Sequence, residues 1–294
     1  MESARCKAFV AAADTGSFSR AAEQLNYTPS GVSQLVAALE KELNVVLLRR
    51  NKKGVSLTPS GEMILPAARA LLLQENSLFQ MAAEINGLSV GNITIATYPS
   101  IAAHWLPRVI NGFRTEHPQI GIHIKEGTRQ EILRWLEAGA VDMGFLSGSD
   151  ALPFDWFPLA EDRIVAILPE THILAQGSSY PLPQCLFESL IMPSSGQDED
   201  VTSMFERNGI SPKIAISTIE GIAAIAMVES GLGISIMNEL VTCGYSGKII
   251  KLPLDPAQSI TLGIAIPSLE SATPAAAKFV KYATICLTQG KQDE

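Results

Sequence analysis

The sequence contains no run of 18 or more apolar residues, which is the length that a membrane-spanning helix requires. Its first ten residues, MESARCKAFV, also lack the apolar stretch and small-residue cleavage site of a secretory signal. Charged residues make up 18% of the chain and hydrophobic residues 47%, as in ordinary globular proteins. We therefore expect a cytoplasmic protein that has no membrane partner.

Cysteine and histidine are scarce, with four residues of each. The cysteines are isolated and show no metal-ligand spacing, so we interpret them as buried free thiols and expect no metal site. The histidines fall in no H-x-E or H-E-x-x-H context, and neither a nucleophile elbow nor a glycine-rich phosphate loop is found. These absences argue against an enzyme, and we expect no catalytic residue and no cofactor.

Residues 17–48, SFSRAAEQLNYTPSGVSQLVAALEKELNVVLL, predict two short helices joined by a tight turn. In the first helix, apolar residues recur at i, i+3, i+4 and i+7 and share one face: Phe18, Ala21, Ala22 and Leu25. The second helix starts where Thr28 supplies a capping oxygen and Pro29 occupies the first helical position. Its outer face is small and polar, with Ser30, Ser33, Gln34, Ala37 and Lys41. Short polar side chains favour a helix that enters the DNA major groove, although helical hairpins outside DNA-binding proteins share this geometry.

The flanking segments add a third helix and a basic hairpin. Before the pair, residues 6–13 carry an apolar stripe at helical spacing, and after it residues 45–57 predict a β-hairpin with the basic tip RRNKKG. Residues 1–60 hold eight Lys and Arg against five Asp and Glu, whereas the whole chain has a net charge of −8. The pattern predicts a winged helix-turn-helix domain at residues 1–58, attached to an acidic remainder.

Several blocks of this sequence resemble the LysR-type transcriptional regulators in order and spacing: GSFSRAAEQL, TPSGVSQ, the L-L-x-R ending at Arg50, and VSLTPSG at residues 55–61. Two positions depart from the family pattern. Leu48 stands where the family usually has Phe, and Gly31 lies inside the second helix, at a cost of about 1 kcal/mol against Ala. The resemblance implies a bacterial transcription factor that binds promoter DNA and a small-molecule effector. It also implies a homodimer or homotetramer and allows a contact with RNA polymerase.

The winged-helix interpretation assigns two kinds of DNA contact. Side chains of the second helix would read base edges, and the basic residues of the hairpin would neutralise phosphates. The predicted DNA-binding residues are Thr28, Pro29, Ser30, Ser33, Gln34, Arg49, Arg50, Lys52 and Lys53.

Residues 59–88 predict one long linker helix. An apolar residue recurs every seven positions, as in a coiled coil, at Ile64, Leu71, Leu78 and Ile85. The alternative is that this stripe packs onto the chain's own domain. A long helix beside a small domain favours dimerisation, which is also the role that the resemblance implies. Pro66 removes a helical hydrogen bond, so we expect a kink or a late start there.

From residue 91 onward, short apolar strands alternate with helices, which predicts β-α-β units and a mostly parallel sheet. The pattern includes one helix over residues 100–116, a short helix near residues 184–188, and separate strands near 248–252 and 260–266. The resemblance implies a two-lobed effector domain at residues 91–294 that is similar to periplasmic binding proteins. Lobe I is expected at about 91–162 and 267–294, and lobe II at about 163–266. The whole chain is thus expected to be an α+β multidomain protein.

Small or hydroxyl-bearing residues follow many of these strands, where open α/β sheets bind their ligands. The predicted effector-binding residues are Tyr98, Ser100, Gly127, Thr128, Ser147, Gly148, Ser194, Ser195, Thr218 and Asn238. Any one Ser or Thr could instead be an ordinary helix cap. In the family, positions that resemble Ser100, Thr128 and Ser194 or Ser195 line the effector cleft.

Hydroxyls and helix ends favour a small anionic metabolite, a carboxylate or an amino acid. Arg129 could pair with it, although an arginine at such a position is more often solvated. A regulator that binds DNA without a ligand, and whose C-terminal region only oligomerises, is the alternative.

Overall fold

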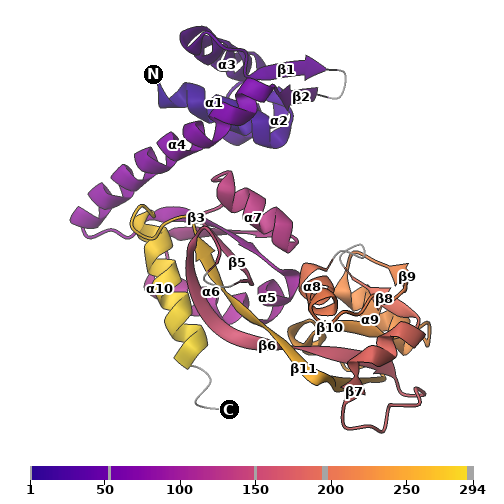
Figure 1. The fold of residues 1–294 in the computed structure, drawn as a ribbon. Coiled ribbons are helices and arrows are strands. Elements are labelled where there is room, and N and C mark those ends of the chain that lie inside the picture. Colours follow the sequence, from indigo (N-terminus) through magenta and orange to yellow (C-terminus); the bar gives the residue numbers. More distant parts are fainter. Residues whose placement is uncertain (1, 52–53, 149–150, 194–197, 290–294) are drawn as a thin grey trace.

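The computed structural model describes residues 2–51, 54–148, 151–193 and 198–289 of the 294-residue chain. Three parts follow one another: a small helical head, one long helix, and a larger α/β region (Figure 1). Within the described ranges, no helix combines the length and the apolar character needed to cross a membrane.

The head, residues 2–57, contains α1 (Ser3–Thr15), α2 (Phe18–Leu25), α3 (Pro29–Leu43) and the hairpin strands β1 (Leu48–Asn51) and β2 (Gly54–Leu57). Asn26 ends α2 in the left-handed conformation, at φ 57°. Thr28 then starts α3, because its hydroxyl accepts a hydrogen bond from the Gly31 N–H at 3.1 Å. Phe9 and Val36 are buried among the three helices. The predicted winged helix-turn-helix is therefore confirmed.

The linker helix is α4 (Pro59–Ile85). It begins at the predicted cap, where the Thr58 hydroxyl accepts a hydrogen bond from the Gly61 N–H at 2.9 Å. Gly61 is needed at this point, because a Cβ there would lie 2.1 Å from the Leu47 carbonyl oxygen. The helix continues through Pro66, so the prediction that it starts late, at this proline, is wrong.

The first part of the C-terminal region contains β3 (Gly91–Thr97), α5 (Pro99–His104), α6 (Leu106–Glu116), β4 (Ile120–Glu126), α7 (Arg129–Glu137), β5 (Met143–Ser147) and β6 (Asp155–Pro169). The second part contains β7 (Tyr180–Pro181), the 3-10 helix η1 (Leu182–Phe187), β8 (Leu190–Met192), α8 (Glu199–Arg207), β9 (Ile214–Ser217), α9 (Gly221–Glu229), β10 (Ser235–Asn238) and the 3-10 helix η3 (Glu239–Thr242). The chain ends with β11 (Ile249–Ile266) and α10 (Pro274–Gln289).

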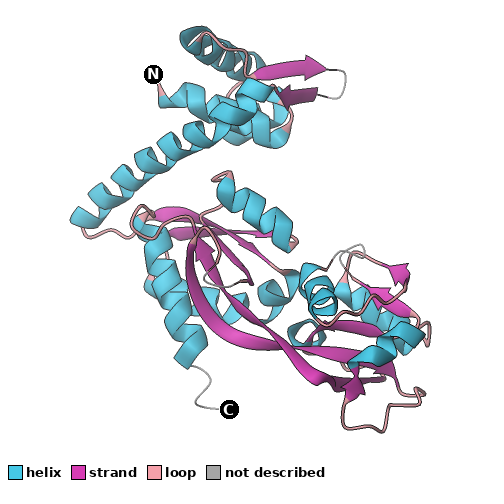
Figure 2. Ribbon diagram, in the orientation of Figure 1, coloured by secondary structure: helices cyan, strands magenta, loops and turns pink. Residues whose placement is uncertain are grey.

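The main sheet is mixed rather than mostly parallel. Its strand order is β10-β6-β11-β5-β3-β4, and β3 is parallel to β4 and β5. In contrast, β11 is antiparallel to β5 and β6, and β10 is antiparallel to β6. The reason is that β6 and β11, of 15 and 18 residues, both cross the region in opposite directions (Figure 2). The two strands expected near 248–252 and 260–266 are the two ends of β11, with a register shift between Pro253 and Gln258.

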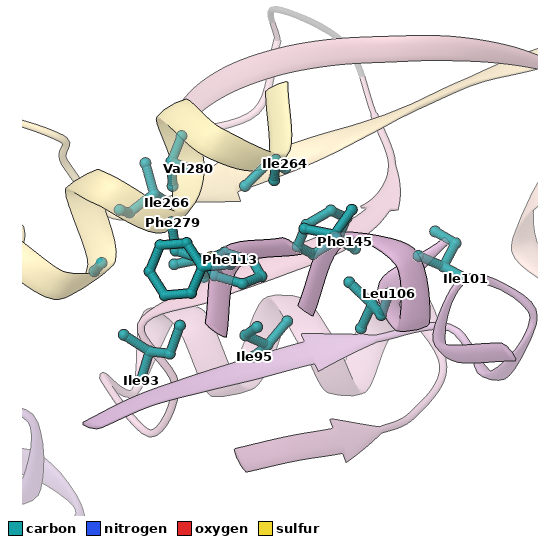
Figure 3. Packing of buried hydrophobic residues seen from close by; sticks show 14 of the residues in the cluster. Ile93, Ile95, Ile101, Leu106, Phe113, Phe145, Ile264, Ile266, Phe279 and Val280 are labelled. Atoms are coloured by element: carbon teal, nitrogen blue, oxygen red, sulfur yellow. The ribbon is translucent and has the colours of Figure 1, made fainter. Parts of the chain in front are cut away.

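Two hydrophobic cores lie at opposite ends of these crossing strands. Lobe I is built around Phe113, Phe145 and Phe279, with the rings of Phe113 and Phe279 at 4.9 Å in an edge-to-face arrangement (Figure 3). Helix α10 therefore returns to lobe I, as the resemblance implied. Lobe II is built around the second group of buried residues, which includes Met204 and Ile236.

The end of β11 belongs to lobe I, because Leu262, Ile264 and Ile266 are part of its core. The expected limit of lobe II at residue 266 is therefore too late along the strand. The single helix expected at 100–116 is broken into α5 and α6 at Trp105, near Pro107, which has no N–H to donate. The short helix expected near 184–188 is the 3-10 helix η1.

Candidate functional site

Helix α3 presents the outer face that the sequence predicted. Val32, Val36 and Leu39 are buried against the rest of the head, whereas Ser30 and Gln34 are exposed. The Thr28 hydroxyl is partly engaged, because it caps the helix and lies 3.1 Å from the Ser30 hydroxyl. Pro29 is exposed beside it. A Cβ at Gly31 would lie 3.1 Å from the Thr28 hydroxyl oxygen, so glycine leaves room for the cap.

The wing is attached to α3 through Arg50. This side chain donates a hydrogen bond to the Ser33 hydroxyl, and its guanidinium lies 4.8 Å from the centre of the Phe18 ring. Arg49 points to the other side of β1 and is exposed. The two lysines of the predicted wing tip, Lys52 and Lys53, lie outside the described residues. In the described part of the wing, Arg49 is exposed and Arg50 is held against α3.

Helix α4 has one face on its own chain and one face exposed. Gln80 is buried and accepts a hydrogen bond from the Ala275 N–H of α10 at 3.0 Å. On the opposite face, Leu71, Leu78 and Ile85 are 38%, 62% and 87% exposed. Ile64, the first residue of the predicted stripe, packs partly against the core of the head. Beyond Ile64 this stripe therefore does not pack onto the chain's own domain, and its role as a dimer contact stays a prediction.

A cavity of about 760 Å³ lies between the two lobes. It brings together five of the predicted effector residues: Tyr98, Ser100, Gly127, Thr128 and Asn238. Its size is within the range of small-molecule sites. Apolar side chains of both lobes also line it, including Pro99, Ile219, Ile222, Val241 and Leu262.

The remaining predicted effector residues are placed differently. Gly148 and Thr218 are not among the described residues that line the cavity. A Cβ at Gly148 would meet the Leu152 and Trp156 side chains, so this position is filled by packing. The Thr218 N–H is used within lobe II, where it donates to the Met192 carbonyl at 3.0 Å. Ser194 and Ser195 lie outside the described residues.

Thr128 and Arg129 place the start of α7 in the cavity. The Thr128 hydroxyl caps α7 by accepting from the Glu131 N–H at 3.4 Å, and the Thr128 N–H donates to the Glu131 carboxylate at 2.9 Å, which completes a capping box. Arg129 follows as the first helical residue and lines the cavity. The alternative role for Thr128, an ordinary helix cap, is thus present in the structure.

Carboxylates of α8 in lobe II bond to the polar groups of lobe I. Glu199 accepts a hydrogen bond from the Arg129 guanidinium at 3.2 Å. Asp200 accepts bonds from the Ser147 hydroxyl at 2.5 Å and from the Tyr98 hydroxyl at 3.4 Å. Ser147 is buried directly behind the cavity, and its carbonyl also accepts from the Arg129 Nε at 3.2 Å. Arg129, Ser147 and Tyr98 of lobe I are therefore already paired with carboxylates of the chain itself.

The cavity lining is acidic overall, which the sequence did not reveal. Among the described residues it includes two arginines, Arg129 and Arg134, and seven carboxylates: Glu126, Glu131, Asp162, Asp198, Glu199, Asp200 and Glu220. Burial raises the pKa of Asp162 to about 6. Burial and the charge of Asp200 raise the pKa of Asp198 to about 6 as well, and burial also raises the pKa of Asp200. The acidic run 198–200 opens a predicted helix, so it could have been recognised as an N-terminal cap but not as part of a cleft.

The described residues contain no group of three or more His, Cys, Asp or Glu arranged to hold a metal ion. The chemistry that this arrangement offers is binding. Arg129 can pair with a carboxylate, the excess of acidic groups can accept an ammonium, and the apolar wall can cover a hydrocarbon group.

Two family models match the chain. The model described as "LysR substrate binding domain" matches residues 86–284, and the model described as "Bacterial regulatory helix-turn-helix protein, lysR family" matches residues 4–62. Among curated proteins, the HTH-type transcriptional regulator YvbU of Bacillus subtilis is 31% identical over 280 residues, which cover 94% of this chain and 96% of YvbU. The HTH-type transcriptional activator CmpR of Synechocystis is 30% identical over 252 residues, which cover 84% of this chain and 83% of CmpR.

Solved structures share the whole architecture. A full-length OxyR variant from Pseudomonas aeruginosa has a TM-score of 0.77 at 22% identity, and the match covers 98% of each chain, so this likeness concerns the fold. Full-length CbnR in complex with its target DNA has a TM-score of 0.57 at 26% identity, and the match covers 98% of this chain and 100% of CbnR.

Proposed function

Because this chain belongs to the LysR family of DNA-binding transcriptional regulators, we propose that its effector is a small zwitterion of the amino-acid class. Membership makes it a regulator with a DNA-binding head and an effector-binding region, related to transcription factors and not to enzymes. The chemical class of the effector is the part that we add.

The observation that carries the proposal is Arg129 in a predominantly acidic cavity between the lobes. In the structure the Arg129 guanidinium donates to the Glu199 carboxylate at 3.2 Å. An effector carboxylate would take the place of Glu199 in this bond. The N-terminal turn of α7 adds its N–H groups and its positive dipole end at the same place.

The acidic lining of the cavity favours an effector that carries a positive charge in addition to its carboxylate. An effector with a negative charge alone would be desolvated among carboxylates, which costs free energy that a single arginine offsets poorly. An ammonium group on the same molecule would face those carboxylates, including Asp162 and Asp198. The side chain of the effector would lie against Ile219, Ile222 and Val241.

We propose the same DNA contacts and dimer contact that the sequence suggested. Gln34 and Ser30 are exposed on α3 and would reach base edges, while Arg49 would contact phosphate. The exposed stripe of α4, Leu71, Leu78 and Ile85, would meet the same stripe of a second copy of the chain.

Thermal shift and titration calorimetry with the full chain test the effector class. The ligand panel is the set of common amino acids, each beside its N-acetyl derivative, which lacks the ammonium, and its amide, which lacks the carboxylate. We expect at least one amino acid to raise the melting temperature and both of its derivatives to lose most of that effect. A carboxylate that acts equally well after N-acetylation would contradict the zwitterion. A panel in which nothing binds would favour the ligand-independent alternative.

A further inference from the structure

Arg69 of α4 contacts the head and the C-terminal region at the same time. Its Nη1 donates a hydrogen bond to the Ala138 carbonyl oxygen at 2.8 Å, at the end of α7. Its Nη2 bonds to the carboxylate of Asp14, near the end of α1 in the head. The Arg69 side chain is only 10% exposed. In Figure 1, α7 accordingly lies on the side of lobe I that faces the head.

The side chain at this position has to reach two acceptors that belong to different domains. A guanidinium is a rigid fork of donors that can serve both, which an ammonium on a flexible stem does less well. The Ala138 carbonyl belongs to the last turn of α7, where carbonyls lack helical partners and carry the negative end of the helix dipole. Gly139 follows with φ +62°, and a Cβ built there would lie 3.7 Å from the Arg69 Cβ. The charged Arg69 side chain is therefore packed closely against the end of α7.

The other end of α7 lies in the effector cavity. The helix has nine residues, Arg129–Glu137, and at about 1.5 Å per residue such a helix spans roughly 13 Å. Thr128 and Glu131 fix its first turn with a capping box. Arg129 in the same turn bonds to Glu199 of lobe II. One short, well-capped helix thus connects the interlobe bond at its start with Arg69 at its end.

We propose that Arg69 is a positioning residue that couples the orientation of the DNA-binding head to the state of the effector cleft, with α7 as the rigid element between them. A ligand that displaces Glu199 from Arg129 changes the restraint on the start of α7. The helix then moves as a unit, the Ala138 carbonyl shifts at Arg69, and the head is held in a different orientation. The inference rests on the proposed function only for the position of the cleft.

A double-mutant cycle on DNA affinity tests the coupling without a ligand. The probe is a duplex that the full-length protein selects from a random-sequence pool, and binding is measured by fluorescence anisotropy. Glu199→Gln keeps an acceptor but removes the negative charge, so it weakens the cleft bond as a competing effector carboxylate would. We expect it to change the dissociation constant at least about fivefold in the parent protein and by less than about twofold in the Arg69→Ala background.

Lys7→Ala is the matched control. Lys7 in the head pairs with Glu75 of α4 at 2.8 Å, so this variant removes a head-to-linker ion pair without affecting α7. The effect of Glu199→Gln should persist in that background. Arg69→Lys, which retains the charge without the fork, replaces Arg69→Ala if the alanine variant fails to fold by circular dichroism.

An equal effect of Glu199→Gln with and without Arg69, or no effect in the parent, overturns the coupling. These outcomes are distinct from failure of the proposed function, which would appear as a parent protein that no amino acid stabilises.

Discussion

Gln34 is the exposed side chain of α3 that is best suited to distinguish bases. Its amide offers both a donor and an acceptor, which matches the edge of adenine in the major groove. The neighbouring Ser33 hydroxyl is already bonded to Arg50. Gln34→Ala should therefore reduce the preference for a selected duplex over random DNA by about 1 to 3 kcal/mol, measured as the ratio of two dissociation constants.

Arg49→Ala is the control for that measurement. An exposed cation that contacts phosphate contributes equally on all sequences, so this variant should weaken both complexes and reduce the slope of binding against salt by about one. If Gln34→Ala weakened both duplexes to the same extent, the recognition role of Gln34 would be wrong.

Asp162 is a buried carboxyl on β6 that lines the cavity, and burial raises its pKa to about 6. Between the unfolded value of 3.8 and the folded value of about 6, the folded state holds the extra proton. The contribution of Asp162 to stability therefore falls as the pH rises through this window, and its unfavourable effect is complete above about pH 6.

Asp162→Asn removes this penalty. Relative to the parent, the variant should gain stability as the pH rises. Its free energy of unfolding minus that of the parent should be roughly 1 kcal/mol larger at about pH 8 than at about pH 5. The amide can still accept the hydrogen bond that the Leu240 N–H donates at 3.1 Å. Denaturant unfolding at the two pH values measures the difference, and an identical change at both would mean that the carboxyl titrates normally in the folded protein.

Among the elements, α7 depends on its N-terminal cap. The Thr128 hydroxyl and the Glu131 carboxylate exchange hydrogen bonds with each other's backbone N–H. Thr128→Val retains the size and removes the cap, so it should lower the free energy of unfolding by about 1 kcal/mol. Thr128→Ser retains the hydroxyl and should stay close to the parent. Equal stability of the Val and Ser variants in chemical denaturation would show that the cap contributes little.

The exposed stripe of α4, Leu71, Leu78 and Ile85, is the proposed dimer contact, and charged substitutions in it test that role. Leu71→Glu together with Leu78→Glu should yield a folded protein that sediments as a smaller species, because carboxylates would be desolvated and would repel one another at the symmetric contact. The control is Asn76→Glu, which adds one carboxylate at an exposed site, roughly 160° around the helix from Leu78. Sedimentation of the double variant as the parent oligomer would place the dimer contact elsewhere.

At the scale of the whole molecule, carboxylates of α8 form hydrogen bonds between the two lobes. Glu199→Ala with Asp200→Ala removes the acceptors of the bonds from Arg129, Ser147 and Tyr98. We expect a larger radius of gyration by small-angle scattering. The loss of stability should be modest, on the order of 1 kcal/mol, because the Arg129–Glu199 pair is partly exposed.

Glu206→Ala serves as the control, since Glu206 is an exposed carboxylate on the last turns of the same helix. It should leave the scattering profile unchanged. If the double variant also scattered like the parent, the pairing of lobes would depend on the crossing strands β6 and β11 alone.

The sequence by itself determined the elements that local signals define. The caps Thr28 and Thr58 set the starts of α3 and α4, because a hydroxyl and the proline after it act within one turn of chain. The helix-turn-helix, the exposed stripe of α4 and the bounds of α8 also follow from patterns within a few residues. The start of α7 at the Thr128 cap belongs to this class too.

Only the tertiary structure decided what distant segments do together. Ile260 pairs with Asp162 across β11 and β6, and no local pattern states the direction of a strand whose partner lies about a hundred residues away. The acidic character of the cleft arises in the same way, because its carboxylates come from separate turns of both lobes. Arg69 meets Asp14 and the Ala138 carbonyl only after three domains have packed, so its role depends on long-range contacts that periodicity does not encode.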